Sequence, residues 1–271
     1  MAYLTAMRNK KALLELAYET SIVYASALPG EQFHKDYQKN KDVFRLVVKS
    51  DRQMEKKLAE YFKELGQRLA LKLNLSTYQL NVKAFDLASY IDADWDGEIL
   101  NLKIIITEAM KNAIIAGGIA AEEELKIDIG WNGTSKPALD FLNKYSLKLA
   151  KGLNDTTIDK VKSALQTSLD NGESTTDAIA RLTDVIDDPK RAATIAHTES
   201  VRAFSQGKLA VAEEVGAEQK EWATTYAPCA ICDPLNGLVV GIDEEFDGEY
   251  DAPPAHPNCR CILRLVLKPS E

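Results

Sequence analysis

All four cysteines of this 271-residue chain fall in one stretch near its C-terminus. Cys229 and Cys232 form a C-x-x-C pair, and Cys259 and Cys261 form a C-x-C pair after 26 further residues, with His256 just ahead of the second pair. A C-x-x-C turn directs two thiolates at one point, and a second pair returned by the fold completes a tetrahedral zinc site. The stretch has few large apolar side chains, so we expect structural zinc to replace the core it lacks.

Five side chains compete for the four positions that a zinc ion usually offers. In an extended strand Cys259 and Cys261 lie on the same face, where binding one ion through both would strain the site. His256 therefore competes for a place. The strongest three candidates are Cys229, Cys232 and Cys259, and the sequence leaves the fourth ligand open.

Two other states of the cysteines compete with zinc: two disulfides, or four reduced thiols in a small core. Disulfides need an oxidising compartment, and the N-terminal residues lack the apolar segment of a secretion signal. The spacing favours zinc over unligated thiols and leaves disulfides as the least favoured state. We accordingly expect a protein made in a cytoplasm.

The net charge restricts the partners that the chain can bind. A formal charge of −8 disfavours a protein that wraps nucleic acid by neutralising phosphates. Six carboxylates lie in the nine positions from Asp243 to Asp251, a tract that is usually a solvated loop but would suit a basic partner surface. Direct DNA binding is a secondary hypothesis. It rests on a modest cluster of lysines, which are Lys144, Lys148, Lys151, Lys160 and Lys162.

Apolar residues at helical spacing predict helices over most of the chain up to residue 216. The clearest stripe runs from Met54 to Leu69 and is expected to face a core. Gly117-Gly118 is expected to end or break a helix that starts near Glu98. Other helices are expected near residues 6–27, 31–48, 120–125, 137–153, 157–169, 174–186 and 190–215.

The pattern then changes to strands and turns. Strands are expected at residues 220–226, 238–242 and 260–267, with Asn236-Gly237 as a turn. The predicted fold class is α+β, a mainly helical N-terminal region followed by a small β-rich, zinc-clipped C-terminal module. We place a helical region at residues 1–153 and a second domain at 154–271, with the Cys/His module at 219–267. Apolar runs fall far short of the roughly 18 residues of a membrane span, so we expect no membrane contact.

The segment Asp92-Ala-Asp94-Trp-Asp96-Gly97 opens like a calcium-binding EF-hand loop. Position 12 of such a loop should be a bidentate Glu, and here it is Lys103. We therefore expect these carboxylates to lie at the N-terminus of the next helix, where they favour its dipole.

A longer set of residues stands in a specific order and spacing along the C-terminal part of the chain. It comprises Arg191 to Ser200, Gly207, Gly216, Lys220 to Trp222, Cys229-x-x-Cys232, Leu235-Asn-Gly237, Phe246, Pro253-Pro254 and His256 to Cys261. This set resembles the Mu F-like phage head-morphogenesis, or minor capsid, proteins. The resemblance is detailed over residues 157–261 and looser over 51–156. The family usually has Arg-Thr-Glu where this chain has His197-Thr198-Glu199, so a role of that arginine is not carried over.

The resemblance implies a structural protein of a phage virion and not an enzyme. Such proteins are incorporated in few copies inside the capsid, dock on the portal vertex, and are linked to head assembly, DNA packaging or DNA ejection. The implied partners are the portal protein and also coat protein, scaffold protein or packaged DNA. Within the signature, Trp222 and Gly237 are structural positions, and Glu199 with Arg202 is a candidate ion pair or cap linking the last helix to the β module.

Two enzymatic hypotheses compete with this role. A metal-dependent hydrolase or nuclease would need an open zinc position and a general base, which Glu199, Asp233 or His256 could supply. Because Cys and His can fill every ligand position, we disfavour it. An ADP-ribosyltransferase is the weakest alternative, since Glu122-Glu-Glu124 has no convincing Arg and Ser-Thr-Ser partners.

Overall fold

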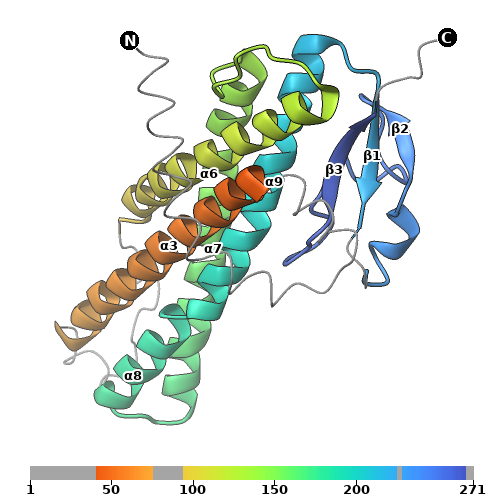
Figure 1. Cartoon of the computed structure of the whole chain (residues 1–271). Helices are drawn as coiled ribbons and strands as arrows, with labels where there is room; N and C mark the ends of the chain where they lie inside the picture. Colours follow the sequence, from red (N-terminus) through yellow and green to blue (C-terminus); the bar gives the residue numbers. More distant parts are fainter. Residues whose placement is uncertain (1–40, 76–93, 225–227, 267–271) are drawn as a thin grey trace, which may run out of the picture. The chain divides into compact units, whose positions relative to one another are not determined.

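The computed structural model describes residues 41–75, 94–224 and 228–266 (Figure 1). The helix expected at residues 6–27, and most of the one expected at 31–48, lie outside the described residues. The helices are α3 (Lys41–Leu75), α6 (Trp95–Leu125), α7 (Lys136–Asp170), α8 (Thr175–Ile186) and α9 (Pro189–Val215). They are followed by β1 (Gln219–Ala223), the 3-10 helix η1 (Asp233–Leu235), β2 (Val239–Gly241) and β3 (Ile262–Val266). Helices come first and strands last, which confirms the α+β prediction.

The three strands form one antiparallel sheet with β1 in the centre, as Figure 1 shows. Lys220 pairs with Val240 of β2 and with Leu265 of β3, and Trp222 pairs with Leu263. Gly237 adopts φ +76°, a value that favours glycine, and its N–H donates to the carbonyl of Trp222 (2.8 Å). The expected Asn236-Gly237 turn therefore leads the chain back along β1.

The two glycines at 117 and 118 do not interrupt α6. A Cβ at Gly117 would lie 1.9 Å from the main-chain oxygen of Phe204, and a Cβ at Gly207 would lie 2.1 Å from that of Ile114. Glycine on both sides thus lets the backbones of α6 and α9 approach closely. At Gly118 the space is filled by the ring of Trp131. The expected break was wrong because the packing gain outweighs the low helix propensity of glycine.

Helix α7 also runs through an expected boundary. The sequence predicts separate helices at residues 137–153 and 157–169, but α7 is continuous, and the hydroxyls of Thr156 and Thr157 donate to the carbonyl of Leu153 (3.0 and 2.7 Å) one turn back. Arg191 Nη2 then donates to both hydroxyls (2.9 and 3.0 Å). The threonines therefore continue the helix, and the division at residues 153 and 154 stays a prediction.

By its contacts, the described chain divides into two compact units. One comprises, among the described residues, 54–75, 94–108 and 142–196. Its core contains the expected stripe of α3, which is confirmed as buried from Met54 to Leu69, together with Leu102 and Ile106 of α6. Arg191 lies over the ring of Phe62 (4.4 Å).

Among the described residues, the other unit comprises 41–53, 109–141, 197–224 and 228–266 and holds the sheet and all four cysteines. Its largest buried side chain is Trp222, which meets Phe246 edge-on with ring centroids 5.3 Å apart. A second cluster packs Leu265 of β3 against Leu125 of α6 and Val211 of α9. The sheet therefore shares a core with two helices.

Helix α6 begins as expected, with Asp94 accepting a hydrogen bond from the N–H of Gly97 (3.0 Å). Asp96 and Glu98 lie in its first turn, where their charge favours the helix dipole. By length and composition α6 is the one helix among the described residues that could cross a membrane. Of its most apolar window 56% is buried inside the protein, which is typical of a core helix.

Candidate metal centre

The first two cysteines lie at the ends of a tight turn. Cys232 N and Asp233 N both donate to the carbonyl of Cys229 (3.0 and 2.9 Å), and η1 follows at once. Because these bonds close the turn, both thiols face the same point.

A second turn of the same length carries His256 and Cys259. Cys259 N donates to the carbonyl of His256 (3.1 Å), and Asn258 adopts φ +60°. Proline at the second position and a left-handed Asn at the third are typical of a type II turn. The chain therefore presents two turns, C-x-x-C and H-x-x-C, each with a metal-ligating side chain at its first and fourth residues.

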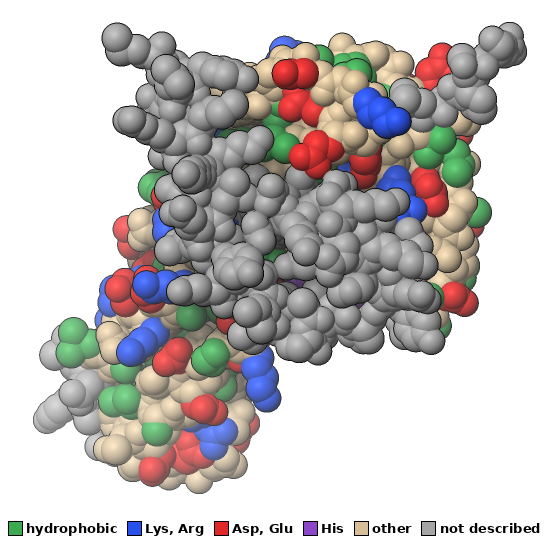
Figure 2. Space-filling view, in the orientation of Figure 1, with side chains coloured by type: hydrophobic (Ala, Val, Ile, Leu, Met, Phe, Trp, Pro, Cys, Tyr) green, Lys and Arg blue, Asp and Glu red, His purple; other side chains and the backbone are tan. Residues whose placement is uncertain are grey.

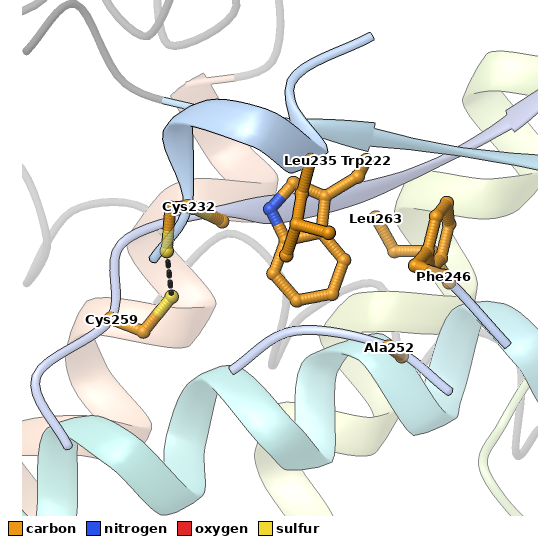
Figure 3. Close-up of a cluster of buried hydrophobic side chains, with 8 residues drawn as sticks. Trp222, Cys232, Leu235, Phe246, Ala252, Cys259 and Leu263 are labelled. Carbon is orange, nitrogen blue, oxygen red and sulfur yellow. Dashed lines mark hydrogen bonds between the residues drawn. The ribbon is translucent and has the colours of Figure 1, made fainter. Parts of the chain in front are cut away.

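The side chains of the two turns meet. His256 Nε2 lies 3.1 Å from Cys229 Sγ and 3.2 Å from Cys232 Sγ. Cys232 Sγ lies 3.7 Å from Cys259 Sγ, and Figure 3 shows these two thiols pointing toward each other beside the Trp222 ring. Zn–S bonds of about 2.3 Å in a tetrahedron separate the sulfur atoms by about 3.8 Å. The four cysteines are free, so this spacing belongs to thiols and not to a disulfide.

All five expected side chains are brought together, as two groups that share Cys232. Cys229, Cys232 and His256 form one group and Cys232, Cys259 and Cys261 the other, each with ligand atoms within 4.8 Å of one another. Both groups are within metal-binding distance. In the described part of the chain neither group contains a carboxylate among its ligand atoms.

Hydrogen bonding and burial make the thiols unequal acids. The hydrogen bond with Cys261 is the main cause that lowers the pKa of Cys259 to about 5. Burial raises the pKa of Cys232 to about 12, and the hydrogen bond to Cys259 raises the pKa of Cys261. One thiolate therefore forms readily, while further ionisation crowds negative charge among buried sulfurs. A divalent cation placed there would relieve that repulsion.

Groups around the thiols fit a metal ion. His256 Nδ1–H donates to the carbonyl of Pro257 (2.8 Å), which leaves Nε2 with its lone pair toward the thiols. The buried Nε1–H of Trp222 meets no oxygen or nitrogen acceptor among the described residues, and it opposes the rise in the pKa of Cys261.

Helix α9 contacts the same loop. Asn258 N donates to the Thr198 hydroxyl (3.0 Å), and Lys208 Nζ donates to the carbonyl of Leu263 (2.8 Å). Lys208 also pairs with Glu124, which accepts from Leu265 N (3.2 Å). The buried pairing of Lys208 with Glu124 is not predicted from the sequence, because a lysine among helical residues normally indicates a solvated face.

The other candidate residues from the sequence make contacts away from the thiols. Arg202 Nε pairs with Glu199 (3.2 Å) within α9, so the candidate ion pair is present, and its role in linking the helix to the sheet stays a prediction. At the position of the family's arginine, His197 Nδ1 lies 3.2 Å from the buried carboxylate of Asp51. Glu122 accepts the N–H groups of Ile129 and Trp131 (2.9 and 3.0 Å), a structural role.

One comparison with known proteins gives a match. Residues 159–264 match the family described as Phage Mu protein F like protein. The matched segment contains all five Cys/His candidates and the four signature residues. No curated protein and no solved structure matches the chain.

Proposed function

We propose that this protein is a structural minor head protein of a tailed phage, because residues 159–264 match the family described as Phage Mu protein F like protein. In this proposal it docks at the portal vertex inside the capsid and assists head assembly, DNA packaging or DNA ejection. The family match is the observation that carries the proposal. Portal protein is the first partner, and coat protein, scaffold protein or packaged DNA are further ones.

The metal centre has a structural role in this proposal. Cys229, Cys232, His256 and Cys259 would hold one zinc ion, because each of the two turns offers its first and fourth residues. Cys261 would remain a core thiol next to Trp222, since binding by both members of the C-x-C pair strains the geometry. Zinc bound there would cross-link the two turns and would have no open coordination position for a substrate.

Charge supports a protein partner ahead of DNA. In the view of Figure 2, acidic and basic side chains are interspersed over the part of the molecule that holds α8. Among the lysines proposed for DNA, Lys144, Lys148 and Lys151 share one exposed face of α7, but Asp155 follows on the same face. Such a face neutralises few phosphates.

Co-expression with the portal protein of the same phage genome tests the main proposal. Co-migration in size exclusion and cross-links from one defined region would support docking. Separation of the two proteins at micromolar concentration, in the presence of zinc, would contradict portal docking and direct the search to coat or scaffold protein.

Metal analysis and a cysteine variant test the structural role. The protein purified without added metal should contain one zinc ion, and Cys229→Ser should lose the folded C-terminal module. A variant that stays folded but loses a hydrolytic activity of the wild type would instead support a metal-dependent hydrolase.

A further inference from the structure

The turn that carries His256 and Cys259 is held from outside by one helix. Asn258 lies between these two residues in the turn, and its N–H donates to the hydroxyl of Thr198 in α9 (3.0 Å). Thr198 is 8% exposed, whereas Asn258 is an exposed residue, so the acceptor is buried and the bond as a whole is partly buried. Loss of the hydroxyl would leave the Asn258 N–H without this acceptor at the edge of the protein, and the turn would lose a contact that ties it to α9.

The geometry of the turn makes that contact relevant to the ligands. Asn258 is in the left-handed region at φ +60°, which a residue other than glycine adopts at an energetic penalty. The hydrogen bond that the Asn258 N–H donates to Thr198 fixes the peptide plane on one side of Asn258, and the bond from Cys259 N to the carbonyl of His256 closes the turn on the other. Together they set the direction in which both candidate ligands leave the backbone.

The same helix holds the strand that follows. Lys208 lies ten residues after Thr198 in α9 and binds the carbonyl of Leu263, two residues beyond Cys261. The loop from His256 to Leu263 is thus fixed to α9 at both ends. In contrast, the main-chain hydrogen bonds that close the Cys229 turn come from residues of the turn itself.

We propose that Thr198 is a positioning residue of the metal centre, which orients His256 and Cys259 without touching the ion. This rests on the proposed zinc site. Hydrogen bonds outside the ligand shell typically change metal affinity by about 10- to 100-fold. Because linkage is reciprocal, zinc should in turn protect the Asn258 amide and the Thr198 region of α9 from hydrogen exchange.

Thr198→Val and Thr198→Ser test the proposal, with Thr107→Val as a matched control. Thr107 is also a helical threonine and is half-buried. Its hydroxyl, however, donates to the carbonyl of Lys103 in its own helix (2.7 Å). Zinc affinity is measured by competition with a chromophoric chelator. We expect T198V to bind zinc about tenfold more weakly, and T198S and T107V to bind within about twofold of wild type.

The same measurements distinguish failure of the zinc site from failure of the role of Thr198. Wild type that binds no zinc would overturn the metal site itself. Wild type that binds zinc, with T198V binding equally tightly, would overturn only the role of Thr198. A merely structural role would lower thermal stability equally with and without zinc, whereas positioning widens the difference between the two states. If T198V does not fold, Thr198→Ala and T198S give the same comparison.

Discussion

Lys208 in α9 donates a hydrogen bond of 2.8 Å to the main-chain carbonyl of Leu263 in β3, although its side chain is only 1% exposed. A buried ammonium persists when it is paired, and Glu124 of α6 supplies the carboxylate. Since Glu124 also accepts from Leu265 N, the pair joins two helices to the strand that follows the cysteines.

Replacing Lys208 by Met should therefore destabilise the protein by about 3 kcal/mol, because Glu124 keeps an amide donor but loses its counterion. Chemical unfolding of K208M measures the change. The double variant K208M/E124Q should recover part of it, since Gln is neutral and still accepts from Leu265. Lys57→Met is the control: it breaks a pair with Glu108 that is largely exposed and should change stability by under about 1 kcal/mol. Equal losses in both single variants would contradict a special role of the buried pair.

The close approach of α6 and α9 predicts that alanine is harmful at Gly207. Its Cβ would lie 2.1 Å from the carbonyl oxygen of Ile114, and backbone cannot move aside as a flexible side chain can. We expect Gly207→Ala to cost about 1–3 kcal/mol in spite of the better helix propensity of alanine. Gly152→Ala in α7 is the matched control, because nothing lies within 4 Å of that position. It should stabilise the helix by roughly 0.5–1 kcal/mol, and thermal unfolding distinguishes the opposite signs.

A carboxylate near the start of α8 predicts a dependence of stability on acid. Hydrogen bonds from Arg181 are the main cause that lowers the pKa of Glu173 from 4.5 to about 2 in the folded protein. The folded state thus favours the ionised form, so its contribution is complete above pH 4.5 and is lost as the pH falls from 4.5 to 2. Wild type and Glu173→Gln, unfolded by urea over this range, should converge in stability toward pH 2. Glu60→Gln, at an exposed carboxylate of α3, is the control for the loss of a surface charge. An offset for E173Q that does not change with pH would contradict the assignment.

Much of the fold could be predicted because each signal was local. The α3 stripe, the Asp94 cap and the Asn236-Gly237 turn depend on residues within a few positions of one another, and each has the expected conformation. Glycines 117 and 207 could not be interpreted in the same way. Their effect depends on backbone oxygens of another helix, which no spacing along the chain reveals.

The Cys/His cluster was predictable in its membership but not in its arrangement, and its binding of a metal stays a prediction. Cysteine spacing identified the five candidates, and the sequence could not choose between His256 and Cys261. In the proposed zinc site this choice would depend on the turn at Pro257 and Asn258 and on the contact with Thr198, which lies 60 residues away in the chain. Lys208 and Glu124 were missed for a related reason, since burial of a charged residue is decided by the partner that the fold brings to it.

The two cysteines of the C-x-C pair have different surroundings and should differ in zinc binding. Cys259 lies 3.7 Å from Cys232 and shares a turn with His256, whereas Cys261 is 3% exposed and packs in the cluster around Trp222. Cys259→Ser should weaken zinc binding by about 100-fold or more, because a hydroxyl is a poor ligand for a zinc ion held by thiolates and an imidazole. The substitution in effect removes one of the four bonds to the metal. Cys261→Ser should retain one zinc ion per chain and lose about 1 kcal/mol of stability as a buried thiol becomes a hydroxyl.

Zinc stoichiometry, chelator competition and the near-ultraviolet signal of the tryptophans measure both variants side by side. Each is a single sulfur-to-oxygen change two residues from the other, so each serves as the control for its neighbour. Loss of zinc from C261S with retention in C259S would reverse the assignment and make Cys261 the fourth ligand. Loss from both would indicate that the C-x-C pair acts together, with His256 outside the ligand set.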